Sequence, residues 1–503
     1  MYRRFISLAY MLFAASSASA QSFELKGVTF TDSVYLADQE LQGEIQPYMD
    51  RPLTFADIQE MTARVQALYT RAGIPSGRVL LLPQEVSDGF LKLDLVEADV
   101  GKIGYEDLNG TSPEWLSQYI SLREGAQPDY AQLERDFRIF QISHDFIPQL
   151  SFAPGEDFAT INVTVGGEVP EKQSWVASLD NFGTETTGEY RASISGRTRN
   201  LAGRRDIASY QLQVSEGALS ASAGYSIPFG LPGGRINAAL GFTKSDVIQG
   251  PFAALDIVSD SVNGSIGYQW PLGVSVDSAW TVDISIGAEN ATSELDGLPF
   301  QDTVISDFSA SVSYQKQAAA YSISGTLGAK VGTADAIETS ETEGDFQLLF
   351  GSLNYTRALF QKAVFETAVQ LQYAPDQNLP VNRLIAAGGP TSVRGYTNSI
   401  RSGDTGVVAR FQVAPLRAYR SKTNSEIGYT PFGFTDVAFV QPFREDGSID
   451  PDQDYLASAG AGVRVDFKDE LNFLLMLAVP LKETLGFTET GKGTVYVGLD
   501  YEF

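Results

Sequence analysis

Leu219-Ser220-Ala221-Ser222-Ala223-Gly224-Tyr225-Ser226-Ile227 carries an apolar side chain at every second position, with serine or glycine between them. A period of two is typical of a β-strand, because successive side chains of a strand point to opposite faces. Apolar residues on one face and small or polar residues on the other suit a strand between lipid and a wet lumen. This stretch therefore predicts a membrane-spanning β-strand.

The same alternation recurs through the last two thirds of the chain. An even number of such strands, with room in each for the roughly 9 to 11 residues that cross a bilayer, predicts a closed antiparallel barrel over residues 171–503. We count sixteen runs: 175–181, 190–195, 208–215, 219–227, 236–242, 262–270, 280–286, 308–314, 321–329, 346–355, 369–373, 407–413, 432–439, 459–467, 471–479 and 495–503.

The lengths of the connections orient this barrel. Outer-membrane barrels have short periplasmic turns and long outside loops, so odd-to-even connections should be long when the amino end is periplasmic. All six long gaps fall on odd-to-even connections, with the moderately long segment 415–428 as the exception on the other side. The long gaps are 245–259, 289–303, 331–344, 375–403, 441–454 and 481–491.

The first twenty residues predict export. Arg3 and Arg4 precede a short apolar core, and Ala18-Ser19-Ala20 forms a small-residue cleavage site, which indicates a signal peptide over 1–20. No later stretch approaches the roughly 18 apolar residues of a membrane helix, so only a closed barrel could span the membrane.

The overall composition narrows the function classes. The chain has no cysteine, which argues against thiol catalysis, thiolate metal sites and a disulfide-stapled domain. A formal charge of −26 disfavours nucleic-acid binding. The single histidine, His144, lies before the barrel and is predicted to be a surface or helix-end residue, so a Ser-His triad in the barrel lacks its base. We therefore expect no enzyme, no metal and no cofactor.

Before the barrel, the pattern strand, helix, helix, strand, strand occurs twice. The first module covers 21–97, with a helix expected from Thr54. The second covers 98–170, with Ser112-Pro113-Glu114 as a helix start. Small sheets of this kind have edge strands that could accept an extended chain, although two rigid spacers would have the same pattern.

The longest outside connection contains Gly388-Gly389-Pro390-Thr391-Ser392-Val393-Arg394-Gly395-Tyr396. Taken alone, Gly-Gly-Pro indicates a turn. With two modules and sixteen strands, the mature chain resembles the haemolysin secretion/activation family, the two-partner (type V) secretion transporters of the outer-membrane insertase superfamily. The modules resemble POTRA domains, and Val393-Arg394-Gly395-Tyr396 matches the family's signature in the sixth outside loop.

The resemblance implies that this loop folds into the lumen as a latch. Its Arg394 would pair with an aspartate on the inner wall of the thirteenth strand, matched here by Asp436 with Phe434 beside it. The alternative is that Asp436 is an ordinary lumen-facing acid, and Ala438 stands where the family pattern has glycine. Phe432 and Phe434 share the inward parity of Asp436, which either a bulge or aromatic packing against the loop could explain.

The resemblance also implies function and location. POTRA domains in the periplasm would receive an unfolded, exported β-repeat protein, and the outer-membrane barrel would secrete it without nucleotide energy. The alternative is an insertase that folds other barrels, and a passive porin would not need the modules. The implied partners are outer-membrane lipids and the barrel-assembly machinery, for which the aromatic Phe503 resembles an assembly signal, and we expect a monomer.

Two further expectations concern the ends of the barrel. Phe23 begins the first module directly after the cleavage site, so we expect no N-terminal plug helix and a lumen filled by the loop alone. Acidic residues gather in the outside connections, where they could bind cations or simply be solvated. They are Glu338, Glu341, Glu343, Glu445, Asp446, Asp450, Asp452 and Asp454.

Overall fold

The computed structural model describes residues 23–86, 88–337, 344–374, 378–421, 426–444, 446–450, 452–468, 470–484 and 491–503. The predicted signal peptide lies outside these residues, as does any segment that could form an N-terminal plug. No helix in these ranges is long and apolar enough to cross a membrane. One compact unit comprises the residues up to 106 together with 121–133 and 150–166, and the other comprises 107–120, 134–149 and 167–503.

The first module is a three-stranded sheet in the order β2-β5-β4, with β2 parallel to β5 and β4 antiparallel to it. Thr54 caps α2 by accepting a hydrogen bond from the backbone N–H of Asp57, as its position before the apolar periodicity predicts. Leu41, Met61 and Val65 of the helices are buried with Leu91 and Leu93 of β5 in one core. The elements are β1 (Phe23–Glu24), β2 (Gly27–Phe30), α1 (Asp38–Ile45), η1 (Gln46–Tyr48), β3 (Pro52–Leu53), α2 (Phe55–Arg71), β4 (Gly77–Leu80) and β5 (Phe90–Glu97).

The second module repeats this topology. Its sheet has the order β6-β8-β7, again with the first strand parallel to the last, so the strand order of the first module recurs in the second. The elements are β6 (Asp99–Tyr105), α3 (Pro113–Leu116), α4 (Tyr130–Ser143), β7 (Ile147–Pro154) and β8 (Thr160–Glu168).

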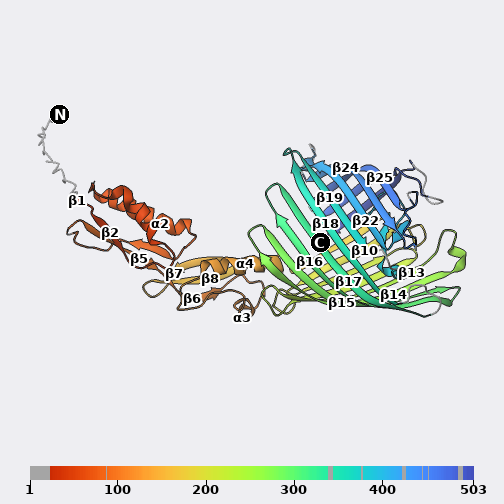
Figure 1. Ribbon diagram of the computed structural model, residues 1–503, viewed down its shortest axis with the longest axis horizontal. Coiled ribbons are helices and arrows are strands. Elements are labelled where there is room, and N and C mark those ends of the chain that lie inside the picture. Colours follow the sequence, from red (N-terminus) through yellow and green to blue (C-terminus); the bar gives the residue numbers. More distant parts are fainter. Residues whose placement is uncertain are drawn as a thin grey trace, which may run out of the picture. The chain divides into compact units, whose positions relative to one another are not determined.

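All of the later strands except β20 (Ile385–Ala387) and β21 (Arg401–Gly403) close into a barrel (Figure 1). Its sixteen long strands, counted over the described residues, are antiparallel to their neighbours, and β27 pairs with β9 to complete the ring. The predicted sixteen-stranded fold is confirmed. The strands are β9 (Gln173–Asp180), β10 (Arg191–Arg199), β11 (Ile207–Val214), β12 (Ala218–Pro228), β13 (Arg235–Asp246), β14 (Ile257–Val274), β15 (Ser278–Leu295), β16 (Leu298–Gln317), β17 (Tyr321–Ile337), β18 (Gly344–Leu359), β19 (Ala363–Tyr373), β22 (Thr405–Pro415), β24 (Ile427–Gln441), β25 (Tyr455–Phe467), β26 (Leu471–Pro480) and β27 (Thr494–Glu502), with the two-residue β23 (Tyr419–Arg420) beside β24.

One predicted outside loop is wrong. Residues 289–303 are not a loop, because β15 continues to Leu295 and β16 begins at Leu298. Asp296 and Gly297 have φ of 50° and 72°, the left-handed pair that a two-residue hairpin turn requires. Hydrogen bonds between the two strands satisfy their backbone N–H and C=O groups both inside and outside the bilayer. The strands can therefore extend past the length needed to cross it. The part of the hairpin beyond the bilayer is rich in polar residues, so the sequence pattern there resembles that of a loop.

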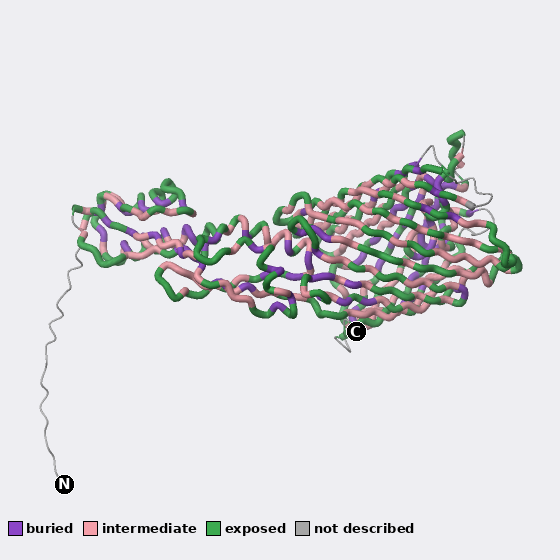
Figure 2. The backbone as a smooth tube through the Cα atoms, turned by 90° about the horizontal axis from the view of Figure 1, so that it is seen from below, coloured by how far each residue is buried: buried purple, intermediate pink, exposed green. Residues whose placement is uncertain are grey.

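Exposed residues alternate with less exposed ones along the strands of the barrel, as the sequence alternation predicts (Figure 2). Leu219 and Tyr225, which belong to the alternating pattern of β12, have exposed outward side chains. Exposed Leu240, Val262 and Ile286 continue this apolar surface on the following strands. An apolar outer surface of this kind suits lipid.

Candidate functional site

The connection from β19 to β22, residues 374–404, is called loop 6 here. It contains a 3-10 turn (η3, Val381–Arg383) and a hairpin of two short strands, β20 (Ile385–Ala387) and β21 (Arg401–Gly403). The hairpin tip begins at Gly388 and Gly389, whose φ values of 113° and 96° disfavour any side chain. A Cβ on Gly389 would lie 2.0 Å from Oδ1 of Asn398. These glycines therefore let the loop fold closely on itself.

The tip places Arg394 directly on Asp436 of the thirteenth strand, β24. Nε of Arg394 donates to Oδ2 and Nη2 donates to Oδ1, each at 2.7 Å, and the backbone N–H of Arg394 also donates to Oδ2 at 3.1 Å. Both residues are buried, with Asp436 0 % exposed and Arg394 2 % exposed. A planar guanidinium matches a carboxylate in this two-bond geometry, which a lysine could not reproduce. Loop 6 is thus folded inward onto the barrel wall.

The aromatic residues of β24 line the same inner wall. Phe432, Phe434, Asp436 and Ala438 are all buried, and β24 pairs with β25 without a register shift. The ring of Phe434 lies 3.5 Å from Cζ of Arg394, within the range of a cation–π contact. Of the two explanations left open by the sequence, aromatic packing against the loop holds and a bulge does not.

Gln412 and Tyr496 are among the contacts of the tip that the sequence reasoning missed. Oε1 of Gln412, on β22, accepts a hydrogen bond from Nη1 of Arg394 at 3.2 Å. The hydroxyl of Tyr496, on β27, accepts one from the N–H of Gly395 at 3.0 Å. The alternation of the sequence does place both side chains on the inner face of strands near β24. It does not show which of the inward side chains contact a loop.

Tyr396 and Val393 complete the docking of the tip. The Tyr396 hydroxyl donates to the backbone oxygen of Lys482 at 2.7 Å and lies 2.9 Å from that of Ala457. Val393 is fully buried in an apolar cluster with Tyr396 and Ala438. A methyl group at position 438 therefore fits beneath the tip, although the family pattern has glycine there.

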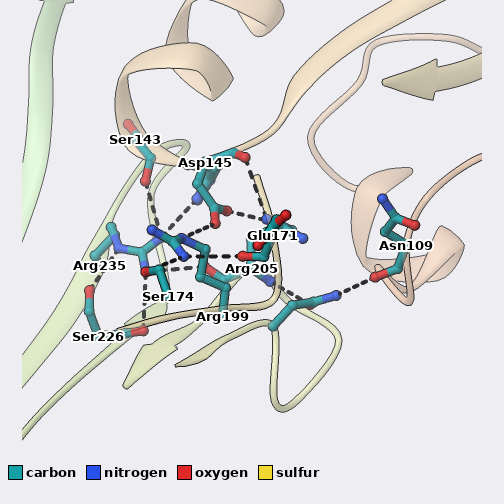
Figure 3. Close-up of polar contacts among 11 residues, drawn as sticks. Asn109, Ser143, Asp145, Glu171, Ser174, Arg199, Arg205, Ser226 and Arg235 are labelled. Carbon is teal, nitrogen blue, oxygen red and sulfur yellow. Dashed lines mark hydrogen bonds and ion pairs between the residues drawn. The ribbon is translucent and has the colours of Figure 1, made fainter. Parts of the chain in front are cut away.

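A second polar cluster joins the turn after α4 to the rim of the barrel (Figure 3). Nε of Arg205, in the turn between β10 and β11, donates to Oδ1 of Asp145 at 2.7 Å. Nη1 of Arg235, at the start of β13, donates to the backbone oxygen of Ser143 at 3.0 Å and to Nδ1 of His144 at 2.9 Å. Arg205 is 2 % exposed, so this cluster is a packed contact and not a solvated surface.

His144 lies at the end of α4 as predicted, but a surface position for it is wrong. Its ring is buried among Trp115, Tyr119 and Phe140. Burial, together with the positive charges of Arg235 and Arg205, lowers the pKa of His144 to about 3. The ring is therefore neutral at physiological pH, which lets Nδ1 accept the hydrogen bond from Arg235. Its hydrogen-bond partner Arg235 lies 91 residues away in the sequence, at the start of a barrel strand, which is why the pattern around His144 did not reveal this contact.

The last residue, Phe503, lies at the seam that closes the barrel. Its backbone N–H donates to the oxygen of Trp175 and its backbone oxygen accepts from the N–H of Trp175, both at 2.9 Å. The side chain is exposed and stacks on Tyr501.

The predicted acidic clusters are only partly described. Glu338, Glu341, Glu343 and Glu445 lie outside the described residues. Asp454 is buried, pairs with Arg444 at 2.7 Å and accepts the backbone N–H of Asp450 at 2.8 Å. Within the described ranges, no group of three or more histidine, cysteine or acidic side chains is arranged to hold a metal ion.

A family model described as haemolysin secretion/activation protein ShlB/FhaC/HecB matches residues 160–465, and a ShlB-type POTRA domain model matches residues 23–98. The chain belongs to this haemolysin secretion/activation family. It is an outer-membrane β-barrel transporter of two-partner secretion, with POTRA domains in the periplasm and a secreted protein as its substrate partner.

The relatives of the transporter are distant in sequence. The heme/hemopexin transporter protein HuxB of Haemophilus influenzae is 20% identical, over 78% of this chain and 72% of the relative. The outer membrane transporter CdiB of Dickeya dadantii is 22% identical, over 79% and 73%. The structure of CdiB from Escherichia coli superposes with a TM-score of 0.69 at 17% identity, covering 97% of this chain and 92% of the other, and supports the fold.

Proposed function

We propose that the transporter passes one unfolded, exported β-repeat protein through its barrel, with Val393-Arg394-Gly395-Tyr396 as a conformational latch on Asp436 and Phe434. The observation that carries this proposal is the buried two-bond pair of Arg394 and Asp436. Such a charge-assisted pair is strong, and it can open and form again because no covalent bond joins the two groups. The proposal assigns no catalytic step, metal or cofactor to any residue.

We assign residues 21–97 and 98–170 to two POTRA domains and 171–503 to the barrel. The outer edge of β4 in the first domain is already occupied, because Gln66 of α2 donates to the oxygen of Gly77 and accepts the N–H of Val79. The edge of β6 in the second domain is bonded to the segment of Glu124 to Ala126. We therefore propose β7 as the edge that receives the substrate as an added strand, since its eight residues offer a longer ladder than the four of β2.

We further propose that the transporter acts as a monomer, because one chain closes the whole barrel and no edge strand of it is left to pair among the described residues. The exposed aromatic ring of Phe503 is the feature that the barrel-assembly machinery would recognise. The exposed apolar outer side chains would meet outer-membrane lipids.

The test is Arg394→Ala in full-length protein in the outer membrane. We expect loss of the secreted partner from the medium while heat-modifiable migration in gels shows a folded barrel. The matched control is Arg464→Ala, which removes an arginine that lies over Phe432 and outside the Asp436 pair. Normal secretion by Arg394→Ala would refute the latch. General loss of barrel proteins, in place of one secreted protein, would favour the insertase alternative.

A further inference from the structure

Loop 6 has a first limb, residues 378–384, that contacts a part of the barrel wall different from the part under its tip. Nη1 of Arg383 lies 2.7 Å from Oε2 of Glu289 on β15, and Nη2 lies 2.7 Å from Oδ2 of Asp307 on β16. Nε of Arg383 also donates to Oδ2 of Asp307, at 3.1 Å. One guanidinium therefore bridges carboxylates of the seventh and eighth strands, whereas Arg394 binds the thirteenth.

The two carboxylates are arranged for a bridging cation. Gly287 is the register partner of Asp307, so Glu289 lies two residues further along β15 on the same inner face. Nζ of Lys330 lies 3.3 Å from Oδ1 of Asp307, and Nδ2 of Asn382 donates to Oε1 of Glu289 at 2.6 Å. With Arg383 in place, two positive and two negative charges balance. Without Arg383, two carboxylates share one lysine.

Apolar packing supports the same limb. Leu379 is 1 % exposed and packs with Ile305, Ala334, Phe346 and Leu348 of the wall, and the half-buried Leu384 joins this cluster. Charged and apolar contacts thus fix the limb to β15–β18. Gly388 and Gly389, in left-handed backbone conformations, separate the limb from the tip.

We propose that Arg383, with Glu289 and Asp307, is a second anchor of loop 6, which positions the limb across the lumen and releases independently of the Arg394 latch. The inference rests on the proposed function, in that loop 6 must yield when the substrate passes. It makes loop 6 a bridge between two parts of the barrel wall, with its own charged contacts at each part.

The experiment measures labelling, in proteoliposomes, of single introduced cysteines by a membrane-impermeant maleimide, because the chain itself has no cysteine. Leu379→Cys reports on the limb and Val393→Cys reports on the tip, and both positions are buried. Arg383→Glu would place three carboxylates together. Loss of a charge-assisted pair in this site predicts labelling of the limb cysteine that is faster by about tenfold or more. The tip cysteine should stay protected.

Two further variants make the result specific. Arg383→Glu with Glu289→Arg reverses the pair and should return labelling of the limb cysteine to the original rate, whereas a merely disrupted loop would not recover. Arg383→Gln replaces Arg383→Glu if the latter does not give a folded barrel. Unchanged labelling of the limb cysteine would overturn the anchor, and joint exposure of the limb and tip cysteines would overturn its independence. These readouts do not depend on secretion, so failure of the Arg394 latch would be seen separately.

Discussion

The clearest quantitative prediction concerns Asp436→Asn, which keeps the shape of the side chain and removes its charge. The carboxylate accepts three hydrogen bonds from Arg394, one of them from the backbone, and none of its surface is exposed. The substitution leaves a buried guanidinium without its counter-charge. Breaking a buried ion pair on one side costs about 3 to 5 kcal/mol, and we expect the lower end because an asparagine oxygen can still accept a hydrogen bond.

A loss of about 3 kcal/mol raises the equilibrium for undocking of the tip by roughly a hundredfold, since about 1.4 kcal/mol corresponds to a factor of ten. The remaining bonds of Tyr396 and Gly395 and the barrel itself are untouched, so the effect is local opening and not unfolding. The assay is maleimide labelling of Val393→Cys, at a position that is fully buried while the tip is docked. Asp436→Asn and its parent are compared in the same cysteine background, so the cost of that cysteine cancels.

The matched control is Asp466→Asn, on the neighbouring strand β25 and outside the contacts of the tip. We expect its tip cysteine to label at the rate of the parent. Should Asp436→Asn label no faster than this control, the pair would contribute nothing to the position of the loop. The latch would then have to be abandoned in favour of an ordinary lumen acid.

Two further predictions follow from the contacts of the tip and of the turn after α4. Tyr496→Phe removes the acceptor for the buried N–H of Gly395, which costs about 1 to 2 kcal/mol, so the tip cysteine of Val393→Cys should label roughly tenfold faster, less than for Asp436→Asn. Tyr455→Phe, with an exposed ring, is the control, and an equal effect of both would contradict the assignment. The pKa of His144 is lowered to about 3 in the folded protein, against an ordinary value near 6.5 in the unfolded chain. The stability that the neutral ring contributes is therefore fully present above pH 6.5 and is lost as the pH falls below it. Protection of residues 143–146 from hydrogen exchange should therefore fall between about pH 6.5 and 4.5, where opening becomes easier by roughly 1.4 kcal/mol per pH unit. His144→Gln, which cannot titrate, should show no such fall, and a persisting one would place the titration elsewhere.

The alternation of apolar and polar residues by itself determined the number of strands and the place of loop 6 among them. A barrel strand has an outer and an inner face along its whole length, so its period of two is local and readable in the chain. Counting sixteen runs put Val393-Arg394-Gly395-Tyr396 in the sixth outside connection and Asp436 on the thirteenth strand, as the structure has them. The two modules were likewise readable, since each of their helices has its own apolar periodicity.

Only the tertiary structure decided which inward residues meet. Phe434 and Asp436 both face inward, where they pack against a loop that enters the lumen. No local sequence pattern shows that this loop covers them. Arg383 finds Glu289 and Asp307 at separations of 94 and 76 residues, and His144 finds Arg235 at 91. Such pairs depend on how a closed barrel brings distant strands and loops to one point. The period of two shows whether a side chain points to the lipid or to the lumen. Closure of the barrel decides which other residues an inward side chain contacts.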